Sequence, residues 1–239
     1  MALWITGSVS GAMFGLLLSG TAAAAPVGAV LVGDYRPLKA IEAEQADAGF
    51  ESAWLVELGK LLGIEFEHDD SPSHAKLHLG AQLSGSAYYS AVPAGLTAAG
   101  SGTVGWSSLA GQPFCIVAGS PHGEVVAARF GGKPRVYPSA AQALIGLKLN
   151  ECRVVVDDAV LLEQIADLPE WRRYNRLLKP LADATTTLRV AANDGALQKK
   201  VDLAVSSKPG QEALSAVTQR WIDEVAFQAY VLADTLDCH

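Results

Sequence analysis

Residues 27–34 read VGAVLVGD, an apolar β-type run that a glycine and an aspartate bring to an end. A helical pattern follows, in which apolar residues recur on one face from Trp54 to Leu62 before Gly63 ends the helix. Residues 64–67, IEFE, alternate as a second strand does. This β-α-β unit predicts a parallel pair of strands joined by a right-handed crossover.

A second α/β pattern begins beyond the middle of the chain. Residues 113–117, PFCIV, predict a strand, and residues 153–156, RVVV, predict a buried strand that Asp157 and Asp158 end. Ser139 is expected to cap a helix, with Gln142 as its capping-box partner. Further helices are expected at residues 124–130, 159–165 and 211–236, with strands at residues 76–79, 135–137 and 188–191.

Two α/β patterns in one chain of 239 residues predict two lobes with a cleft between them. Residues 100–102, GSG, favour a crossing between the lobes. We therefore expect lobe one to comprise residues 25–99 and 189–239, and lobe two residues 100–188. The fold class is α/β, two-lobed, with a hinge and a central cleft.

The first 24 residues have the layout of a cleaved secretory signal peptide. They carry no charge, and a short apolar run ends in small residues that favour cleavage after Ala24. The alternative is an uncleaved membrane anchor, although the run is short for a bilayer. We expect a periplasmic protein that does not span the membrane after processing.

Composition narrows the classes of partner. Half of the residues are hydrophobic and 18% are charged, which favours a packed globular protein. The net charge is −7 and there is no basic run, so nucleic acid is not expected as a partner. Nothing resembles a phosphate loop or a dinucleotide-binding fingerprint, so no cofactor is expected.

Ligands of open α/β sheets lie beyond the carboxyl ends of the strands. The residues that follow the expected strands are therefore the candidates for ligand binding. Tyr35 would stack on a planar or apolar group, or else simply pack against its turn. Ser120 would hold an anion, or else cap a helix. Asp158 would accept from an ammonium or hydroxyl group, or else cap the next helix. His122 is a further candidate, with an exposed loop imidazole as its alternative.

Two other kinds of site are weighed against solute binding. Ser120, His122 and Asp158 contain the residue types of a hydrolase triad, but the Gly-x-Ser-x-Gly signature is absent. Imidazole and carboxylate groups at positions 68, 69, 70, 74 and 78 suit a metal, but a polar loop explains them equally well. We expect neither an enzyme nor a metal site.

The three cysteines are Cys115, Cys152 and Cys238, an odd number for an exported chain. A Cys115–Cys152 disulfide is favoured because both residues lie at the starts of expected strands. The alternative is three buried thiols, and Cys238 lies in the C-terminal tail.

Four segments together resemble solute-binding family 3, the periplasmic amino-acid-binding proteins of ABC importers. They are residues 30–38, residues 48–51 followed by 58–64, residues 109–120 and residues 152–158. The resemblance implies a strand that ends in a ligand-facing Asp158 and a pair of tyrosines, Tyr88 and Tyr89, near the ligand. Some members of the family carry cysteines at both positions that match Cys115 and Cys152.

The chain departs from the family pattern in lobe one. The family places an arginine before its paired tyrosines to clamp the ligand's carboxylate, but no arginine lies between Arg36 and Arg129. The preceding helix is also missing, so lobe one is expected to be trimmed. The resemblance implies a small polar solute and an inner-membrane ABC permease as partners. The alternative is a non-transport partner or sensor module, associated with an exported oxidoreductase such as a periplasmic dehydrogenase.

Overall fold

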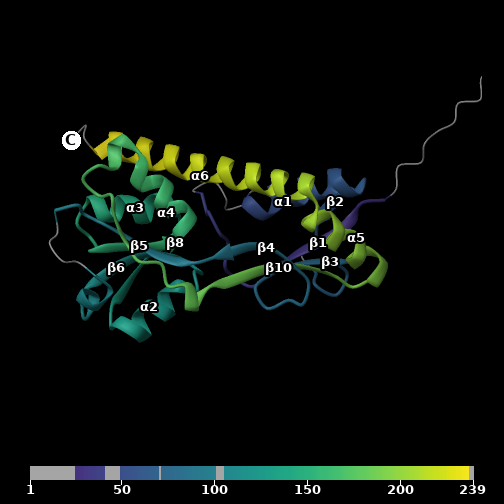
Figure 1. Cartoon of the computed structure of the whole chain (residues 1–239), viewed down its shortest axis with the longest axis horizontal. Coiled ribbons are helices and arrows are strands. Elements are labelled where there is room, and N and C mark those ends of the chain that lie inside the picture. Colours follow the sequence, from purple (N-terminus) through teal and green to yellow (C-terminus); the bar gives the residue numbers. More distant parts are fainter. Residues whose placement is uncertain (1–24, 41–48, 70, 101–104, 237–239) are drawn as a thin grey trace, which may run out of the picture.

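The computed structural model describes residues 25–40, 49–69, 71–100 and 105–236. The expected signal peptide and Cys238 lie outside these residues. Two mixed five-stranded sheets form the two halves of an elongated molecule (Figure 1). The two-lobed α/β fold that the sequence predicts is therefore confirmed.

The sheet of lobe one has the strand order β2-β1-β3-β10-β4. Its strands are β1 (Val27–Val32), β2 (Phe66–His68), β3 (Leu77–Gly80), β4 (Ser86–Ala91) and β10 (Thr186–Ala192). β1 runs parallel to β2 and β3, which confirms the β-α-β unit, whereas β10 runs antiparallel to β3 and β4. Only residues 81–85 join β3 to β4, with no helix between them, so lobe one is trimmed as expected.

The sheet of lobe two has the order β7-β6-β8-β5-β9. Its strands are β5 (Pro93–Thr97), β6 (Pro113–Val117), β7 (Lys133–Tyr137), β8 (Val154–Asp158) and β9 (Arg176–Leu178). β6 runs parallel to β7 and β8, so their carboxyl ends share one edge, and β5 runs antiparallel to β8.

The helices cover the sheets and begin or end where the sequence provides caps. They are α1 (Phe50–Leu62), α2 (His122–Phe130), α3 (Ala140–Lys148), α4 (Ala159–Asp167), α5 (Gly195–Ser206) and α6 (Lys208–Leu236), with 3-10 turns at Trp106–Leu109, Pro169–Trp171 and Ala182–Ala184. Ser139 caps α3, its Oγ accepting from the backbone N–H of Gln142 at 3.2 Å. Gly63 ends α1 in the left-handed conformation that glycine favours.

The crossings between the lobes differ from the expected boundaries. The chain leaves the first sheet after β4 and enters the second at β5, so it crosses at Val92 rather than near Gly100. It returns between β9 and Thr186, where β10 begins, slightly before the expected residue 189. The expectation was wrong because one apolar run holds two strands of different sheets with a single residue between them.

The long helix α6 packs on both lobes. It lies lengthwise over the molecule, above α1 at one end and beside α3 and α4 at the other (Figure 1). The helix expected at residues 211–236 has an apolar stripe, which is buried at Val217, Ile222, Val225 and Ala229. The buried apolar residues of the two lobes form one continuous cluster that includes these side chains. α6 and this shared core therefore brace the lobes against one another.

The disulfide predicted from the sequence is present. Cys115 on β6 and Cys152, two residues before β8, are bonded, with 5.6 Å between their Cα atoms. Both residues are buried in lobe two, where the bond joins the starts of two neighbouring parallel strands.

Membrane spans are a separate question from the fold. Within the described residues, no helix combines the length and the hydropathy that crossing a bilayer requires.

Candidate functional site

The Asp158 carboxylate lies at the last residue of β8 and is fully buried. Its backbone pairs with Pro93 of β5, just beyond the crossing at Val92. Asp158 also occupies the N-cap position of α4, but its side chain makes no capping hydrogen bond. The helix-cap interpretation of Asp158 is therefore wrong, and the carboxylate is available to other partners.

Three side chains from different elements converge on this carboxylate. The hydroxyl of Tyr35 lies 2.8 Å from both carboxylate oxygens, and that of Tyr89 donates to Oδ2 at 2.7 Å. His122 Nε2 lies 2.7 Å from Oδ1. An ionised carboxylate only accepts hydrogen bonds, so each of these groups donates to it. Tyr35 and Tyr89 belong to lobe one, and His122 and Asp158 to lobe two.

The topology explains why these residues meet. Tyr35 follows β1, His122 begins α2 after β6, and Asp158 ends β8, so all three lie beyond the carboxyl ends of parallel strands. Tyr89 reaches the same point from β4, three residues before the crossing. The sequence-based choice of Tyr35, His122 and Asp158 thus selected residues that lie together. The exposed-loop alternative for His122 is wrong, because its side chain is buried.

Burial keeps the two tyrosines protonated, so they remain donors. Burial first, and then the Asp158 charge, raise the pKa of Tyr35 well above its ordinary value. The same two causes, in the same order, raise the pKa of Tyr89. Both hydroxyls therefore donate to Asp158 across the physiological pH range.

Asp157 is a second buried acid that the sequence analysis did not single out as a binding residue. Its Oδ1 accepts from the backbone N–H of Asp158 at 2.8 Å, whereas its Oδ2 is buried and has no partner among the described residues. Burial and the neighbouring Asp158 charge raise the pKa of Asp157 to about 7. The only sequence signal for this residue is its place at the end of a buried strand.

The variant Asp157→Asn is expected to be more stable than the wild type above pH 7, by on the order of 2 kcal/mol. The unfolded chain loses the Asp157 proton near pH 4, whereas the folded protein holds it until about pH 7. Wild-type stability contributed by this group is therefore lost as pH rises between those values, and the variant lacks this loss. Urea unfolding at pH 4.5, 6 and 8 measures the difference.

Asp183→Asn is the control, because this exposed acid pairs only with Arg129 on the surface. Its effect is expected to be small and nearly the same at all three pH values. A parallel pH dependence of Asp157→Asn and the wild type would contradict the assignment of the raised pKa to Asp157.

Ser120 and Tyr88 do not join the group around Asp158. Ser120 Oγ accepts from the backbone N–H of His122 at 3.4 Å, but the N-cap position of α2 is occupied by Pro121, without a side-chain cap. His122 Nδ1 has no hydrogen-bond partner within the described residues, so Ser120 is not bonded to the imidazole as a nucleophile would be. Tyr88 packs against Phe50, with 6.4 Å between the ring centroids. Tyr89 contacts the same Phe50 ring, with 5.2 Å between the centroids. The two tyrosines differ in their hydroxyls, because that of Tyr89 is bonded to Asp158, whereas that of Tyr88 has no hydrogen-bond partner within the described residues.

A further buried acid near β4, Glu51, was missed by sequence reasoning. Glu51 on α1 is buried, and burial raises its pKa to about 7 despite the opposing charge of Arg36. Arg36 itself donates from Nη1 to the backbone oxygen of Tyr35 at 2.8 Å. The guanidinium nearest the site in sequence is therefore committed within lobe one.

The strand ends of the two lobes are in close contact. Gly119, which has a φ of +81°, lies so near Asp34 that a Cβ at this position would be 2.6 Å from the Asp34 backbone oxygen. The N–H of Ala140, at the start of α3, donates to the oxygen of Lys39 at 3.0 Å. Together with the bonds to Asp158, these contacts hold the lobes closed at the site.

No group of three or more His, Cys, Asp or Glu side chains within the described residues is arranged to hold a metal ion. His68 and His78 lie on different strands, β2 and β3, and Asp70 lies outside the described residues.

Comparison with known proteins supports the fold and gives no sequence relative. No family model matches the chain, and no curated protein matches it in sequence. The arginine-, lysine-, histidine-binding protein ArtJ from Geobacillus stearothermophilus is similar in structure, with a TM-score of 0.54 and 16% identity; the match covers 82% of this chain and 95% of that one.

Two further structures have the same arrangement. An arginine 3rd transport system periplasmic binding protein from Legionella pneumophila has a TM-score of 0.56 and 12% identity, with 83% of this chain and all of the other covered. The BvgS VFT2 domain of Bordetella pertussis has a TM-score of 0.55 and 15% identity, with 82% and 92% covered. The chain has the two-lobed fold of periplasmic binding proteins.

Proposed function

We propose that this chain is a periplasmic protein that binds a small cationic solute, an amine, between its two lobes. The observation that carries the proposal is the buried carboxylate of Asp158, which has only neutral tyrosine hydroxyls and one imidazole as partners. Within the described residues, no lysine or arginine pairs with it. An ammonium group in place of a tyrosine would add its own positive charge to a hydrogen bond that the ionised carboxylate already strengthens.

An amine fits this site better than a full amino acid. Recognition of an α-carboxylate would need a cation, and Arg36 is engaged with the Tyr35 backbone and faces Glu51. The carboxylate of Asp158, as an acceptor, therefore suits the positive end of a ligand. Two of the structural neighbours, the arginine-, lysine-, histidine-binding protein and the arginine transport system binding protein, support the choice of cationic solutes as first candidates.

A pocket of about 340 Å³ lies beside the site and is large enough for a small amine. Tyr89 forms part of its wall, together with Gln164 on α4 and Gln211 and Gln219 on α6. In the proposed binding event, Tyr89 turns away from Asp158 and the amine takes its place. The closed form competes with the ligand. The apparent affinity is therefore the affinity of the open form multiplied by the fraction of molecules that are open.

Two substitutions are expected to change amine affinity in opposite directions. Asp158→Asn removes the charge and should weaken binding of putrescine or L-arginine by at least tenfold. Tyr89→Phe removes a competing donor and should strengthen it. Calorimetric titration with each amine, and with neutral 1,4-butanediol as the matched ligand control, measures both effects.

The proposal is wrong if neither amine binds the wild type at millimolar concentration, or if the diol binds as well as putrescine. It is also wrong if Asp158→Asn, shown to be folded by its thermal unfolding transition, keeps the wild-type affinity. Delivery of the solute to an inner-membrane ABC permease would follow from the same lobe closure.

The contacts between the lobes favour a second candidate, a non-transport partner of an exported oxidoreductase. α6 and the Asp158 hydrogen bonds join the two lobes in one closed shape through the protein's own side chains, as a docking module requires. Co-elution with a periplasmic dehydrogenase, together with no binding across the amine panel, would favour this role over solute capture.

A further inference from the structure

We propose that the far end of lobe two contains a separate binding site for a small oxyanion, a carboxylate or a phosphate. The site is a pocket of about 470 Å³ lined by Arg153, Gln112, Asn150, Thr97 and Tyr174, and it extends to the disulfide at Cys152. It lies at the start of β8, whereas Asp158 lies at the end of the same strand, roughly 16 Å away at 3.3 Å per residue. This inference is independent of the amine site.

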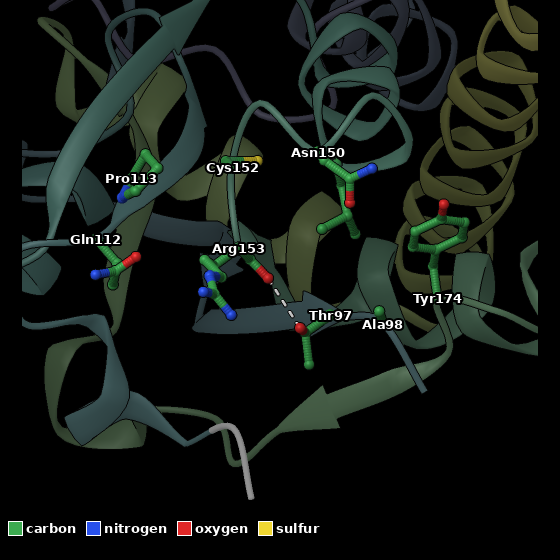
Figure 2. Close-up of a pocket in the computed structure, with 9 residues that line it drawn as sticks. Thr97, Ala98, Gln112, Pro113, Asn150, Cys152, Arg153 and Tyr174 are labelled. Atoms are coloured by element: carbon green, nitrogen blue, oxygen red, sulfur yellow. Dashed lines mark hydrogen bonds between the residues drawn. The ribbon is translucent and has the colours of Figure 1, made fainter. Parts of the chain in front are cut away.

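The guanidinium of Arg153 is the principal anion receptor. Figure 2 shows it in the middle of the pocket, between Gln112 on one side and Thr97 and Tyr174 on the other. Arg153 has no ion-pair partner within the described part of the chain. The nearest acid in sequence, Glu151, is engaged by Arg135 at 3.0 Å and by the Tyr137 hydroxyl.

Backbone hydrogen bonds hold the main chain of Arg153 in place. Its N–H donates to the oxygen of Pro113 at 2.9 Å, and its own oxygen accepts from Thr97 Oγ1 at 2.8 Å. The adjacent Cys152 is fixed by the disulfide to β6. These bonds fix the backbone from which the exposed Arg153 side chain extends.

The other polar groups of the pocket are also suited to an oxyanion. The side-chain amides of Gln112 and Asn150 make no hydrogen bond within the described residues and offer N–H donors. No carboxylate lines the pocket. The adjoining pocket shares Tyr174 and is lined by Lys148, Arg172 and Arg173 against a single acid, Glu170. In a protein of net charge −7, this end of lobe two therefore attracts anions.

Titration of ¹⁵N-labelled full-length protein with citrate, and separately with inorganic phosphate, tests the proposal at constant ionic strength. We expect saturable shifts of the Arg153 Nε–H signal and of the Gln112 and Asn150 side-chain amide signals. Citrate binding more tightly than phosphate would assign a carboxylate ligand, and the reverse order a phosphate. The absence of saturable shifts with both anions would overturn the proposal.

Variants then locate the site by calorimetry. Arg153→Gln should weaken binding of the preferred anion by at least tenfold, and Arg153→Lys should weaken it less, because a lysine keeps the charge without the planar fork. Arg129→Gln, which removes an arginine paired with Asp183 elsewhere on lobe two, should leave the affinity unchanged. Equal affinities of the wild type and Arg153→Gln would contradict the assignment.

The two proposals can be tested separately, and either can be wrong while the other is right. Asp158→Asn should keep anion binding, and Arg153→Gln should keep amine binding, because the residues lie at opposite ends of β8. Should Arg153→Gln fail to fold, the amide and guanidinium signals of the wild type still decide the outcome.

Discussion

Replacing Asp158 by alanine is expected to lower the free energy of unfolding by about 3–5 kcal/mol. The substitution removes the acceptor of three buried donors, the hydroxyls of Tyr35 and Tyr89 and the imidazole of His122. Each donor would then be buried without an acceptor, which costs free energy, and the hydrogen bonds between the lobes at Asp158 would be lost. Urea unfolding at pH 7.5, followed by tryptophan fluorescence, measures the change.

Asp194→Ala is the matched control, since Asp194 is also an aspartate at the N-cap of a helix. Asp194 is exposed and caps α5 through bonds from the N–H groups of Ala196 and Leu197. Its loss is expected to cost about 1 kcal/mol, the usual value for a helix cap. Equal effects of the two substitutions would mean that Asp158 contributes no more than an ordinary cap.

Val225→Asp on α6 is the second substitution with a large expected effect. Val225 is fully buried in the core that the two lobes share, so the variant places a carboxylate there without a partner. We expect a loss of about 3–5 kcal/mol and a lower midpoint of thermal unfolding. Differential scanning calorimetry measures both.

Phe227→Asp, two residues away on the same helix, is the control. Phe227 is 61% exposed, so this larger change of side chain should cost less than about 1 kcal/mol. If Phe227→Asp destabilised the protein as much as Val225→Asp, the burial of one face of α6 against both lobes would be wrong.

The local sequence predicted the site better than it predicted the join between the lobes. The rule that ligands lie beyond the carboxyl ends of strands selected Tyr35, His122 and Asp158, and these side chains meet. The strand that ends at Asp158 was recognisable because its apolar run ends abruptly in two acids. Local sequence patterns were therefore enough to predict a site residue whose position is fixed by the end of a single strand.

The features that could not be predicted from the sequence depend on contacts between residues far apart in the chain. The pattern of residues 86–97 does not show that the chain changes sheets at Val92, because both strands are apolar and no turn residue separates them. Nor does it show that the hydroxyl of Tyr89 reaches Asp158, since β4 and β10 pair with an irregularity at this point. The stripe on α6 was predictable, but its packing on both lobes depends on tertiary structure.

The central claim is that the protein's own side chains at Asp158 hold the two lobes closed. Small-angle X-ray scattering of the full-length protein, purified without added solute, tests it most directly. We predict a profile that matches the closed structure, and a larger radius of gyration for the double variant Tyr35→Phe/Tyr89→Phe, which lacks both hydroxyl donors. A wild-type profile that already requires separated lobes, unchanged in the double variant, would contradict the claim.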